Sequence, residues 1–342
     1  MANFANLDNA VSLHVLRDLQ NTVGGKERDR IASLFAAYHK DVAEPVVAQM
    51  ATDSTSISLR ERGIAELPFS LSRDLCDEVQ QYYSATPCHN AHVPVYSDGI
   101  LRPVSGAARD FHYGSYSLEQ TVRAPHLLEL ALDRRVLERV IAYLKAVPTL
   151  YSINTFWSFP QERSGLTQDW HRDEDDYRFL AVFIYWTDVA VGDGEFYYFP
   201  YTHDVELMDD FINNRRVGPW ARDRLPPSID SFDAFRRLNG GNGYANGALY
   251  EGLFEKQMDC IAGPAGSAFI SDTFGIHRGS LPRKRPRLVT WFRYGLYQNE
   301  AYRIDKTSPV SWSLAGSRIA KDDWTQYICR LILQDSESDR PQ

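Results

Sequence analysis

Hydrophobic positions in the first part of the chain recur at intervals of three or four residues, as they do on one face of a helix. The pattern predicts a helix over residues 28–50, which Pro45 ends or kinks because proline lacks an N–H and clashes with the preceding turn. The residues expected on its buried face are Ile31, Leu34, Phe35 and Tyr38. Residues 51–58 are polar and predict a linker, so residues 1–62 are expected to form a helical extension ahead of the main domain.

The next elements are a short strand and two helices. Residues 63–68 predict the strand, and Ser70 or Ser72 can cap the helix that follows. A second helix is expected from about residue 126 to residue 144, after a loop-rich stretch that contains several prolines and glycines. The inner face of the first helix is expected to carry Leu75, Val79 and Tyr82 or Tyr83.

From residue 151 the pattern changes to short runs of aromatic and β-branched residues, which favour strands. Loops rather than regular helices separate these runs, and this favours an antiparallel barrel or sandwich over a sheet built from βαβ units. We therefore expect a mainly β protein with flanking helices. The predicted strands are 151–159, 179–186, 195–199, 266–271 and 288–294.

A long segment, at about residues 204–262, interrupts the predicted strands and includes the glycine-rich run 239–243. Loops of this length within a compact domain are usually functional or disordered. We expect the segment to act as a lid. A C-terminal helix is expected at about residues 317–333, so the main domain is predicted to cover residues 63–342.

Composition argues against several classes of function. The chain has 342 residues, of which 44% are hydrophobic and 13% aromatic, so it can bury a substantial core. A net charge of −8 disfavours a nucleic-acid partner, because such binding relies on neutralising phosphates. The four cysteines show no CxxC spacing and predict reduced thiols. With no evident secretory signal and no apolar run long enough to cross a bilayer, the expected location is cytoplasmic.

The strongest chemical signal lies just before the strand predicted at 179–186. His171 and Asp173 are two positions apart, so in an extended segment both side chains point to the same face. With His277 from a distant segment, they offer two nitrogens and one oxygen to a single ion. This ligand set leaves coordination positions open and is typical of non-haem Fe(II) oxygenases.

Neighbouring acidic residues compete with Asp173 for the role of ligand. Residues 173–176 are all acidic and would, taken alone, be read as a solvated turn. Glu174 points away from His171 if the segment is extended, so Asp173 is the preferred ligand. Asp175 or Asp176 is then expected to orient Arg172 or the metal ligands.

An arginine ten residues after His277 suggests how the open side of the ion is used. Arg287 begins a predicted strand, and its planar guanidinium suits two-point binding of a carboxylate on an anionic cosubstrate. Arg293 is expected on the same face but farther from the metal, so it is the second candidate for binding that carboxylate. Arg283 and Arg285 lie in a turn with two prolines, where a solvated loop is the default.

Together these motifs resemble the phytanoyl-CoA dioxygenase family of Fe(II)- and 2-oxoglutarate-dependent oxygenases. The resemblance runs from about residue 63 to residue 297 and includes the early strand 63–68, the HxD motif, the later histidine and Arg287. Residues 194–203 are similar to the family's strand and turn of this region, although Tyr201 stands where the family usually has glycine.

The resemblance implies a double-stranded β-helix, a jelly-roll core of cupin type, with Fe(II) held by His171, Asp173 and His277. It implies that Arg287 binds the C5 carboxylate of 2-oxoglutarate. The implied reaction uses O2 to oxidise an unactivated C–H bond of a small molecule, releases succinate and CO2, and takes ascorbate as the reductant in vitro. Halogenases of this family have a small residue in place of the carboxylate, so Asp173 favours hydroxylation or another oxidation without halogen.

Four further residues have two interpretations each. Gln168 is a candidate for binding the C1 carboxylate of 2-oxoglutarate, as is Asn154, although polar residues at strand ends more often bind nearby backbone. Trp186 is either a core residue or a wall of the cosubstrate site. His203 matches a structural histidine of the family more closely than it matches a metal ligand.

Two other functions fit the same residues. One is a cupin-like metal hydrolase or isomerase that uses the three ligands without 2-oxoglutarate. The other is a non-catalytic binding module on the same fold. The sequence leaves the substrate open among lipids, sugars, amino acids and secondary metabolites.

Overall fold

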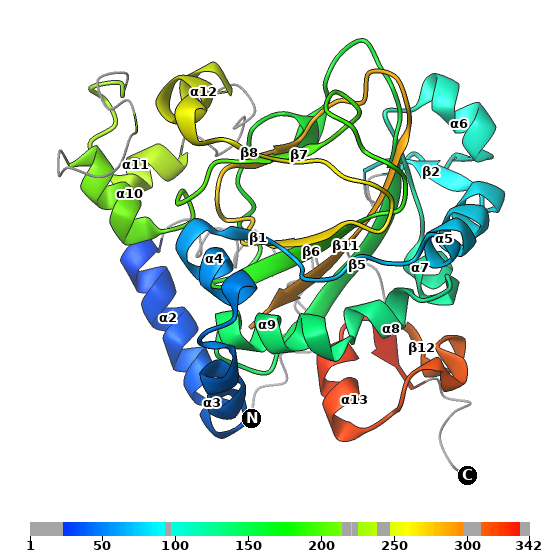
Figure 1. Ribbon diagram of the computed structural model, residues 1–342, viewed down its shortest axis with the longest axis horizontal. Coiled ribbons are helices and arrows are strands. Elements are labelled where there is room, and N and C mark those ends of the chain that lie inside the picture. Colours follow the sequence, from blue (N-terminus) through cyan, green and yellow to red (C-terminus); the bar gives the residue numbers. More distant parts are fainter. Residues whose placement is uncertain are drawn as a thin grey trace.

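In the computed structural model, the described residues are 23–92, 97–213, 220, 225–237, 247–296 and 309–335. They form a large antiparallel sheet and a small antiparallel sheet, with helices packed around the large one (Figure 1). The mainly antiparallel sheet with flanking helices that the sequence predicts is therefore confirmed. The glycine-rich run 239–243 lies outside the described residues.

The large sheet has eight strands among the described residues. Its central strands are buried along their whole length, which is why they appear in the sequence as continuous apolar runs. Its order is β1 (Ile64–Glu66), β9 (Ala268–Ser271), β6 (Phe179–Tyr185), β11 (Arg287–Gly295), β5 (Thr149–Ser158), β4 (Tyr113–Ser115), β2 (Cys88–Asn90) and β3 (Leu101–Arg102).

The small sheet, in the order β10 (His277–Gly279), β7 (Phe196–Tyr198) and β8 (Asp259–Ile261), packs on one face of the large sheet. Aromatic rings fill the space between them, as where Phe183 of β6 and Phe196 of β7 have ring centres 5.0 Å apart. Alternation along β6 sends Phe183 toward this aromatic cluster and Ile184 toward the opposite face.

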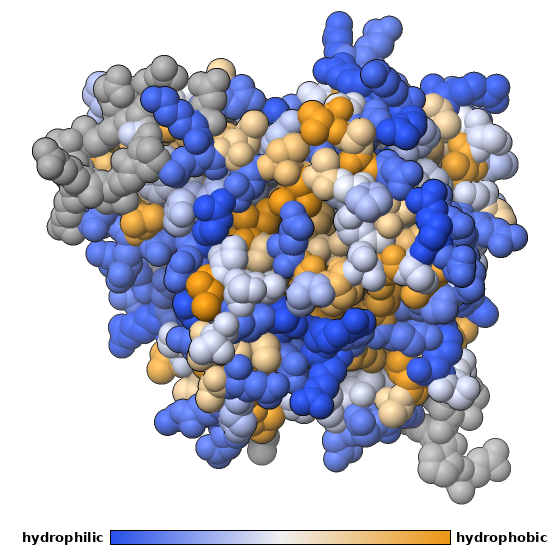
Figure 2. Space-filling model, in the orientation of Figure 1, coloured by the Kyte–Doolittle hydropathy of each residue, from blue (hydrophilic) through white to orange (hydrophobic). Residues whose placement is uncertain are grey.

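Helices cover that opposite face of the large sheet. In Figure 1, α8 (Leu127–Ala131) and α9 (Arg134–Leu144) run below the sheet, and α5 (Arg73–Ala85) and α7 (Leu118–Arg123) lie at its end. A third group, α2 (Gly25–Ala37), α3 (Lys40–Met50) and α4 (Ser54–Arg62), comes from the start of the chain. Helix α6 (Val104–Asp110) lies between β3 and β4. Figure 2, in the orientation of Figure 1, shows apolar side chains gathered near the middle of the side toward the viewer, with hydrophilic ones around its edge.

The segment 204–262 contributes helices as well as β8. They are α10 (Val205–Ile212), α11 (Phe232–Arg237) and α12 (Gly247–Phe254). Together with Trp170, Phe199 and Phe274 they form a second apolar cluster, apart from the main core. The insertion is thus packed against the small sheet on the side shown at the upper left of Figure 1.

Two predictions for the N-terminal region are wrong, and a third is confirmed only in part. The helix predicted at 28–50 is two helices, separated at Tyr38 and His39, and Pro45 lies inside the second helix. The buried face of α2 carries Arg28, Ala32 and Ala36. Of the residues predicted for that face, Phe35 packs against the main core, whereas Leu34 and Tyr38 are 61% and 86% exposed. Small residues allow α2 to pack closely against its neighbours, and this outweighs the apolar spacing. The predicted linker 51–58 contains the start of helix α4.

Two other helices lie closer to the positions predicted from the sequence. Ser72 caps α5 by accepting a hydrogen bond from the Leu75 N–H, and the buried face of α5 carries Cys76, Val79 and Tyr83. The C-terminal helix predicted at 317–333 is shorter than expected: α13 covers Asp323–Cys329 after its N-cap Asp322. The chain then becomes extended at β13 (Leu333–Gln334), which pairs in parallel with β12 (Val310–Ser311). No helix among the described residues is long and apolar enough to cross a membrane.

Candidate metal centre

The predicted metal ligands come together at the edge of the small sheet. His171 and His277 form an antiparallel bridge, in which each backbone N–H donates to the other's carbonyl oxygen over 3.0 and 2.9 Å. The Asp173 N–H donates to the carbonyl oxygen of Thr273 over 2.9 Å. Gly275 is required nearby because a Cβ there would lie 1.9 Å from the Tyr198 hydroxyl. Backbone pairing thus places all three side chains on one face.

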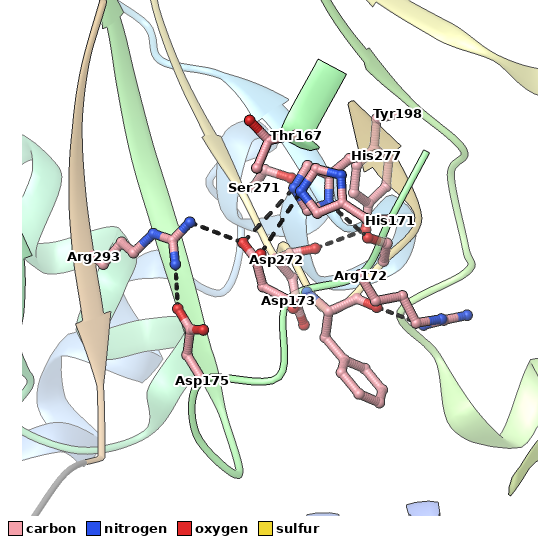
Figure 3. A network of polar contacts seen from close by, with 12 residues as sticks. Thr167, His171, Arg172, Asp173, Asp175, Tyr198, Ser271, Asp272, His277 and Arg293 are labelled. Atoms are coloured by element: carbon pink, nitrogen blue, oxygen red, sulfur yellow. Dashed lines mark hydrogen bonds and ion pairs between the residues drawn. The ribbon is translucent and has the colours of Figure 1, made fainter. Parts of the chain in front are cut away.

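The three side chains converge on one point (Figure 3). His171 Nε2 lies 3.8 Å from Asp173 Oδ1, and His277 Nε2 lies 3.7 Å from Asp173 Oδ2. One possible ligand atom from each residue lies within 4.8 Å of the other two. These separations suit ligands of one ion, whose bonds to nitrogen and oxygen are about 2.0–2.2 Å long.

Both imidazoles are oriented for metal binding through Nε2. The Nδ1 atoms lie 2.8 Å from the Asp169 carbonyl oxygen for His171 and 2.9 Å from the Gly275 carbonyl oxygen for His277. Each Nδ1 therefore carries the proton, and the Nε2 lone pair faces the common point. Burial lowers the pKa of both imidazoles, that of His277 to about 3, so both are neutral as metal binding requires.

The carboxylate of Asp173 is kept ionised by its neighbours. Burial acts to raise the pKa of Asp173, but Arg293 and the two imidazoles outweigh it and hold the pKa well below its usual range. Arg293 Nη2 lies 3.1 Å from Asp173 Oδ2, and Arg293 Nη1 donates to Asp175. The expectation that Arg293 lies farther from the metal than Arg287 is wrong, because β11 carries its side chain directly to the carboxylate of Asp173.

Asp175 and Asp176 differ in their surroundings. Asp175 binds Arg293 and accepts a hydrogen bond from the Tyr151 hydroxyl over 2.9 Å, so it orients the arginine that pairs with Asp173. Asp176 instead accepts from the backbone N–H groups of Tyr177 and Leu296, away from the metal cluster. Burial raises the pKa of Asp176 to about 7.

A cavity lies between the two sheets beside the cluster. Its wall includes His171, His277, Arg287 and Arg293, so the two histidine ligands and both candidate arginines face the same space. The rest of the wall is mainly apolar and would exclude water from a bound ligand. These lining residues are Phe156, Phe183, Tyr185, Phe196, Phe269, Val289 and Trp291.

Arg287 lies at a suitable distance from the cluster for a short dicarboxylate. Its terminal nitrogens would lie 3.2 and 3.3 Å from a Cβ at Gly279, two residues beyond His277 on β10. Two residues of a strand span about 7 Å. The guanidinium is 5% exposed, donates to Gly194 and to Ser158 Oγ, and has a buried Nε with no partner among the described residues. The donor set therefore fits a carboxylate at the far end of the cavity.

Two predicted cosubstrate residues do not line this cavity. The Gln168 side chain accepts a hydrogen bond from the Gly165 N–H over 2.9 Å, and its amide nitrogen is buried without a partner among the described residues. Trp186 lies in the core on the other face of the large sheet, where its indole N–H donates to Thr290 Oγ1 over 2.7 Å. Trp186 thus occupies a core position and is not a wall of the cavity, because it follows the outward-facing alternation of β6.

Asn154 and His203 also serve local contacts. Asn154 Nδ2 donates to the carbonyl oxygen of His92 over 2.9 Å. His203 Nε2 lies 3.2 Å from the carbonyl oxygen of Arg60, and His203 is not part of the metal cluster.

Sequence reasoning missed His92, which lines the cavity. Its ring centre lies 4.9, 4.7 and 4.8 Å from those of Tyr113, Phe156 and Trp291, and its Nε2 lies 3.1 Å from Thr167 Oγ1. Burial, together with the charge of Arg293, lowers the pKa of His92 to about 3. The residue belongs to a loop-rich stretch without a recognisable spacing to the HxD motif, so no local signal identified it.

Comparison with known proteins gives only distant likenesses. No family model matches the chain, and no curated protein matches it. Among solved structures, it is similar to the non-haem α-ketoglutarate-dependent carbocyclase SnoK from nogalamycin biosynthesis, with 18% identity, a TM-score of 0.42, and coverage of 71% of this chain and 83% of that one. The structure of HygX from Streptomyces hygroscopicus with nickel and 2-oxoglutarate shows 13% identity and a TM-score of 0.42, over 71% of this chain and 87% of that one. The structure of EctD from S. alaskensis with 2-oxoglutarate and 5-hydroxyectoine shows 14% identity and a TM-score of 0.46, over 83% of this chain and 88% of that one. Likenesses this distant do not assign the chain to a family, and the functional assignment rests on the geometry of the site.

Proposed function

We propose that this chain is an Fe(II)- and 2-oxoglutarate-dependent oxygenase that oxidises an unactivated C–H bond of a small molecule. One observation carries the proposal: two imidazole Nε2 atoms and one carboxylate converge beside a mainly apolar cavity whose wall includes a buried arginine, Arg287. A ligand trio alone would fit several metal enzymes. The buried cation in the wall of the same cavity favours an anionic cosubstrate bound next to the metal.

Within this proposal each residue has a distinct role. His171, Asp173 and His277 hold Fe(II), and Arg287 binds the C5 carboxylate of 2-oxoglutarate with its remaining N–H donors. When bound, the iron supplies the activation of O2, coupled to conversion of 2-oxoglutarate into succinate and CO2. Arg293 keeps Asp173 ionised and oriented, and the aromatic wall keeps water from the reacting groups.

The proposal extends to the architecture. The two facing sheets are the two halves of a double-stranded β-helix of the jelly-roll, cupin-like type, within a domain of residues 63–342. The place of the three ligands, at the edge of the small sheet and beside the space between the sheets, supports this. Membership of the phytanoyl-CoA dioxygenase family, and hydroxylation as the outcome, stay predictions from sequence.

A binding experiment without substrate tests the proposal first. Under anaerobic conditions, adding 2-oxoglutarate to the Fe(II)-loaded protein should produce a visible metal-to-ligand charge-transfer band. The variant His277→Ala should lose Fe(II) binding. Arg287→Ala should keep Fe(II) but bind 2-oxoglutarate about 10- to 150-fold more weakly, because hydrogen bonds to charged groups contribute about 1.5–3 kcal/mol.

Arg285→Ala is the matched control, since Arg285 lies two positions earlier and pairs with Asp193 outside the cavity. Iron binding with no effect of 2-oxoglutarate would favour a metal hydrolase or isomerase, and no iron binding would favour a non-catalytic module. If the band forms, succinate release with Fe(II), ascorbate and a panel of lipids, sugars, amino acids and secondary metabolites identifies the substrate class.

A further inference from the structure

The residues that alternate with the metal ligands point away from the cavity. His171 and Asp173 face the cluster, whereas Trp170, Arg172 and Glu174 contact groups on the opposite side of the segment. Figure 3 shows the guanidinium of Arg172 directed away from the carboxylate of Asp173. This is the alternation of an extended backbone, so each ligand is flanked by residues whose contacts lie elsewhere.

Arg172 contacts helix α11. Its side chain is 4% exposed, and Nη1 donates to the carbonyl oxygens of Thr202, at 2.8 Å, and of Phe274. Its guanidinium carbon lies 5.4 Å from the ring centre of Phe232 and 5.8 Å from that of Phe235, both on α11. These distances are within the range of cation–π contacts, so the two rings of α11 pack against the guanidinium.

Glu174 forms a second contact with the same helix. Its Oε1 lies 3.5 Å from Nε of Arg236, whose side chain is only 3% exposed. An ion pair with one nearly buried partner is weakly screened by solvent, and removal of either partner leaves the other charge poorly solvated. Residues on both sides of Asp173 are therefore held by α11.

Glu251 on helix α12 joins the two segments that carry the histidines. Its Oε1 accepts a hydrogen bond from the Trp170 indole N–H over 2.8 Å and lies 3.3 Å from Arg278 Nη1. The guanidinium carbon of Arg278 lies 4.5 Å from the Trp170 ring centre. Since Trp170 precedes His171 and Arg278 follows His277, one carboxylate of the insertion contacts a neighbour of each imidazole.

The described part of the insertion does not cover the cavity. None of the residues that line the cavity belongs to the described part of 204–262. All of the contacts above lie on the far side of the two ligand-bearing segments. The position of α11 and α12 therefore suits control of ligand spacing, and the lid stays a prediction for a segment that includes residues outside the described part.

We infer that α11 and α12 hold the two ligand-bearing segments in position from the side opposite the cavity. Arg172, Glu174, Arg278 and Glu251 are the positioning residues. The inference rests on the proposed metal site and adds that its affinity depends on the insertion. Changes to groups that orient metal ligands typically weaken metal binding about 10- to 100-fold. Here the effect should pass through residues that never touch the metal or the cavity.

The test measures Co(II) binding to the full chain by calorimetry and by the visible absorption spectrum of bound Co(II), without cosubstrate. Glu251→Ala should weaken Co(II) binding about 10-fold and alter the spectrum, because both joined segments lose a contact. Glu251→Gln, which can still accept from Trp170 but cannot pair with Arg278, should restore part of the affinity. Glu206→Ala is the matched control, since Glu206 is an exposed glutamate on α10 of the same insertion.

Unchanged affinity and spectrum in a folded Glu251→Ala protein would overturn the inference. If that variant unfolds, Arg278→Lys provides the second measurement, because lysine keeps the charge but loses the planar contact with Trp170. A spectrum unchanged by Arg278→Lys would then overturn it. A wild-type chain that binds no Co(II) and no Fe(II) would instead overturn the proposed function, so the two failures are distinguishable.

Discussion

Arg293, a residue of the cavity wall, forms an ion pair with Asp173, with 3.1 Å between Arg293 Nη2 and Asp173 Oδ2. The side chains are 10% and 12% exposed, so solvent screens the pair weakly. Arg293 also binds Asp175, which accepts a hydrogen bond from Tyr151. The charge and orientation of one proposed metal ligand therefore depend on a strand that is distant in sequence.

Replacing Arg293 by Met removes the cation and keeps most of the side-chain volume. Burial then acts on Asp173 without this opposing charge, so its pKa rises and protons compete with the metal at higher pH than in the wild type. Co(II) affinity should fall more steeply on acidification between about pH 8 and pH 5, the range in which a raised carboxyl pKa acts. Calorimetric titrations at several pH values measure this. An Arg283→Met control changes an exposed arginine, and identical pH profiles for Arg293→Met and wild type would contradict the role of Arg293.

Gly279→Ala should separate cosubstrate binding from metal binding. The added Cβ would lie 3.2 Å from Arg287 Nη2, closer than ordinary van der Waals contact, so the guanidinium has to move. We expect 2-oxoglutarate affinity to fall about 10-fold, corresponding to roughly one lost charged hydrogen bond. Fe(II) affinity should be unchanged. Gly106→Ala is the control, because no atom lies within 4 Å of a Cβ there, and an equal loss in both variants would count against the prediction.

Trp186→Phe should affect stability and leave the cavity intact. The indole is fully buried against the helices and donates to Thr290 Oγ1. Loss of volume and of this hydrogen bond should lower the free energy of unfolding by about 1–3 kcal/mol. Urea unfolding measures the stability, and anaerobic titration measures 2-oxoglutarate affinity, which should stay at the wild-type value. A large loss of 2-oxoglutarate affinity in the folded variant would contradict the core role and indicate that Trp186 contributes to the cosubstrate site.

The metal-free protein should lose stability on mild acidification. Burial lowers the pKa of His92 to about 3, whereas a histidine in an unfolded chain titrates near about 6.5. The unfolded state therefore binds the proton more readily, and stability is lost as pH falls from about 6.5 toward about 3. At pH 5 this single group accounts for up to about 2 kcal/mol. His92→Phe should reduce the loss between pH 8 and pH 5 in urea unfolding, and an unchanged loss would show that His92 is not responsible.

Much of the candidate site follows from local rules that the sequence exposes directly. His171 and Asp173 share a face because an extended backbone alternates, whatever surrounds it. The central strands were recognisable because burial on both faces demands continuous apolar runs. Arg287 stood out because a charged residue at the start of such a run needs a partner.

Other features depended on contacts between distant residues. The exposed positions of Leu34 and Tyr38 follow from close packing of the small residues on α2. The register of β11 places Arg293 beside Asp173, and the register shifts just beyond it, between Arg293 and Tyr294. His92 enters the cavity from a loop that carries no periodic signal.

The sequence by itself determined which residues could bind a metal and that His171 and Asp173 would share one face of an extended segment, because ligand chemistry and the alternation of an extended backbone are local properties. Only the tertiary structure decided which arginine neutralises Asp173, that Trp186 faces away from the cavity, and that α11 and α12 contact the residues flanking the ligands. Those outcomes depend on strand register and on the packing of segments far apart in the chain, and no local pattern encodes either of them.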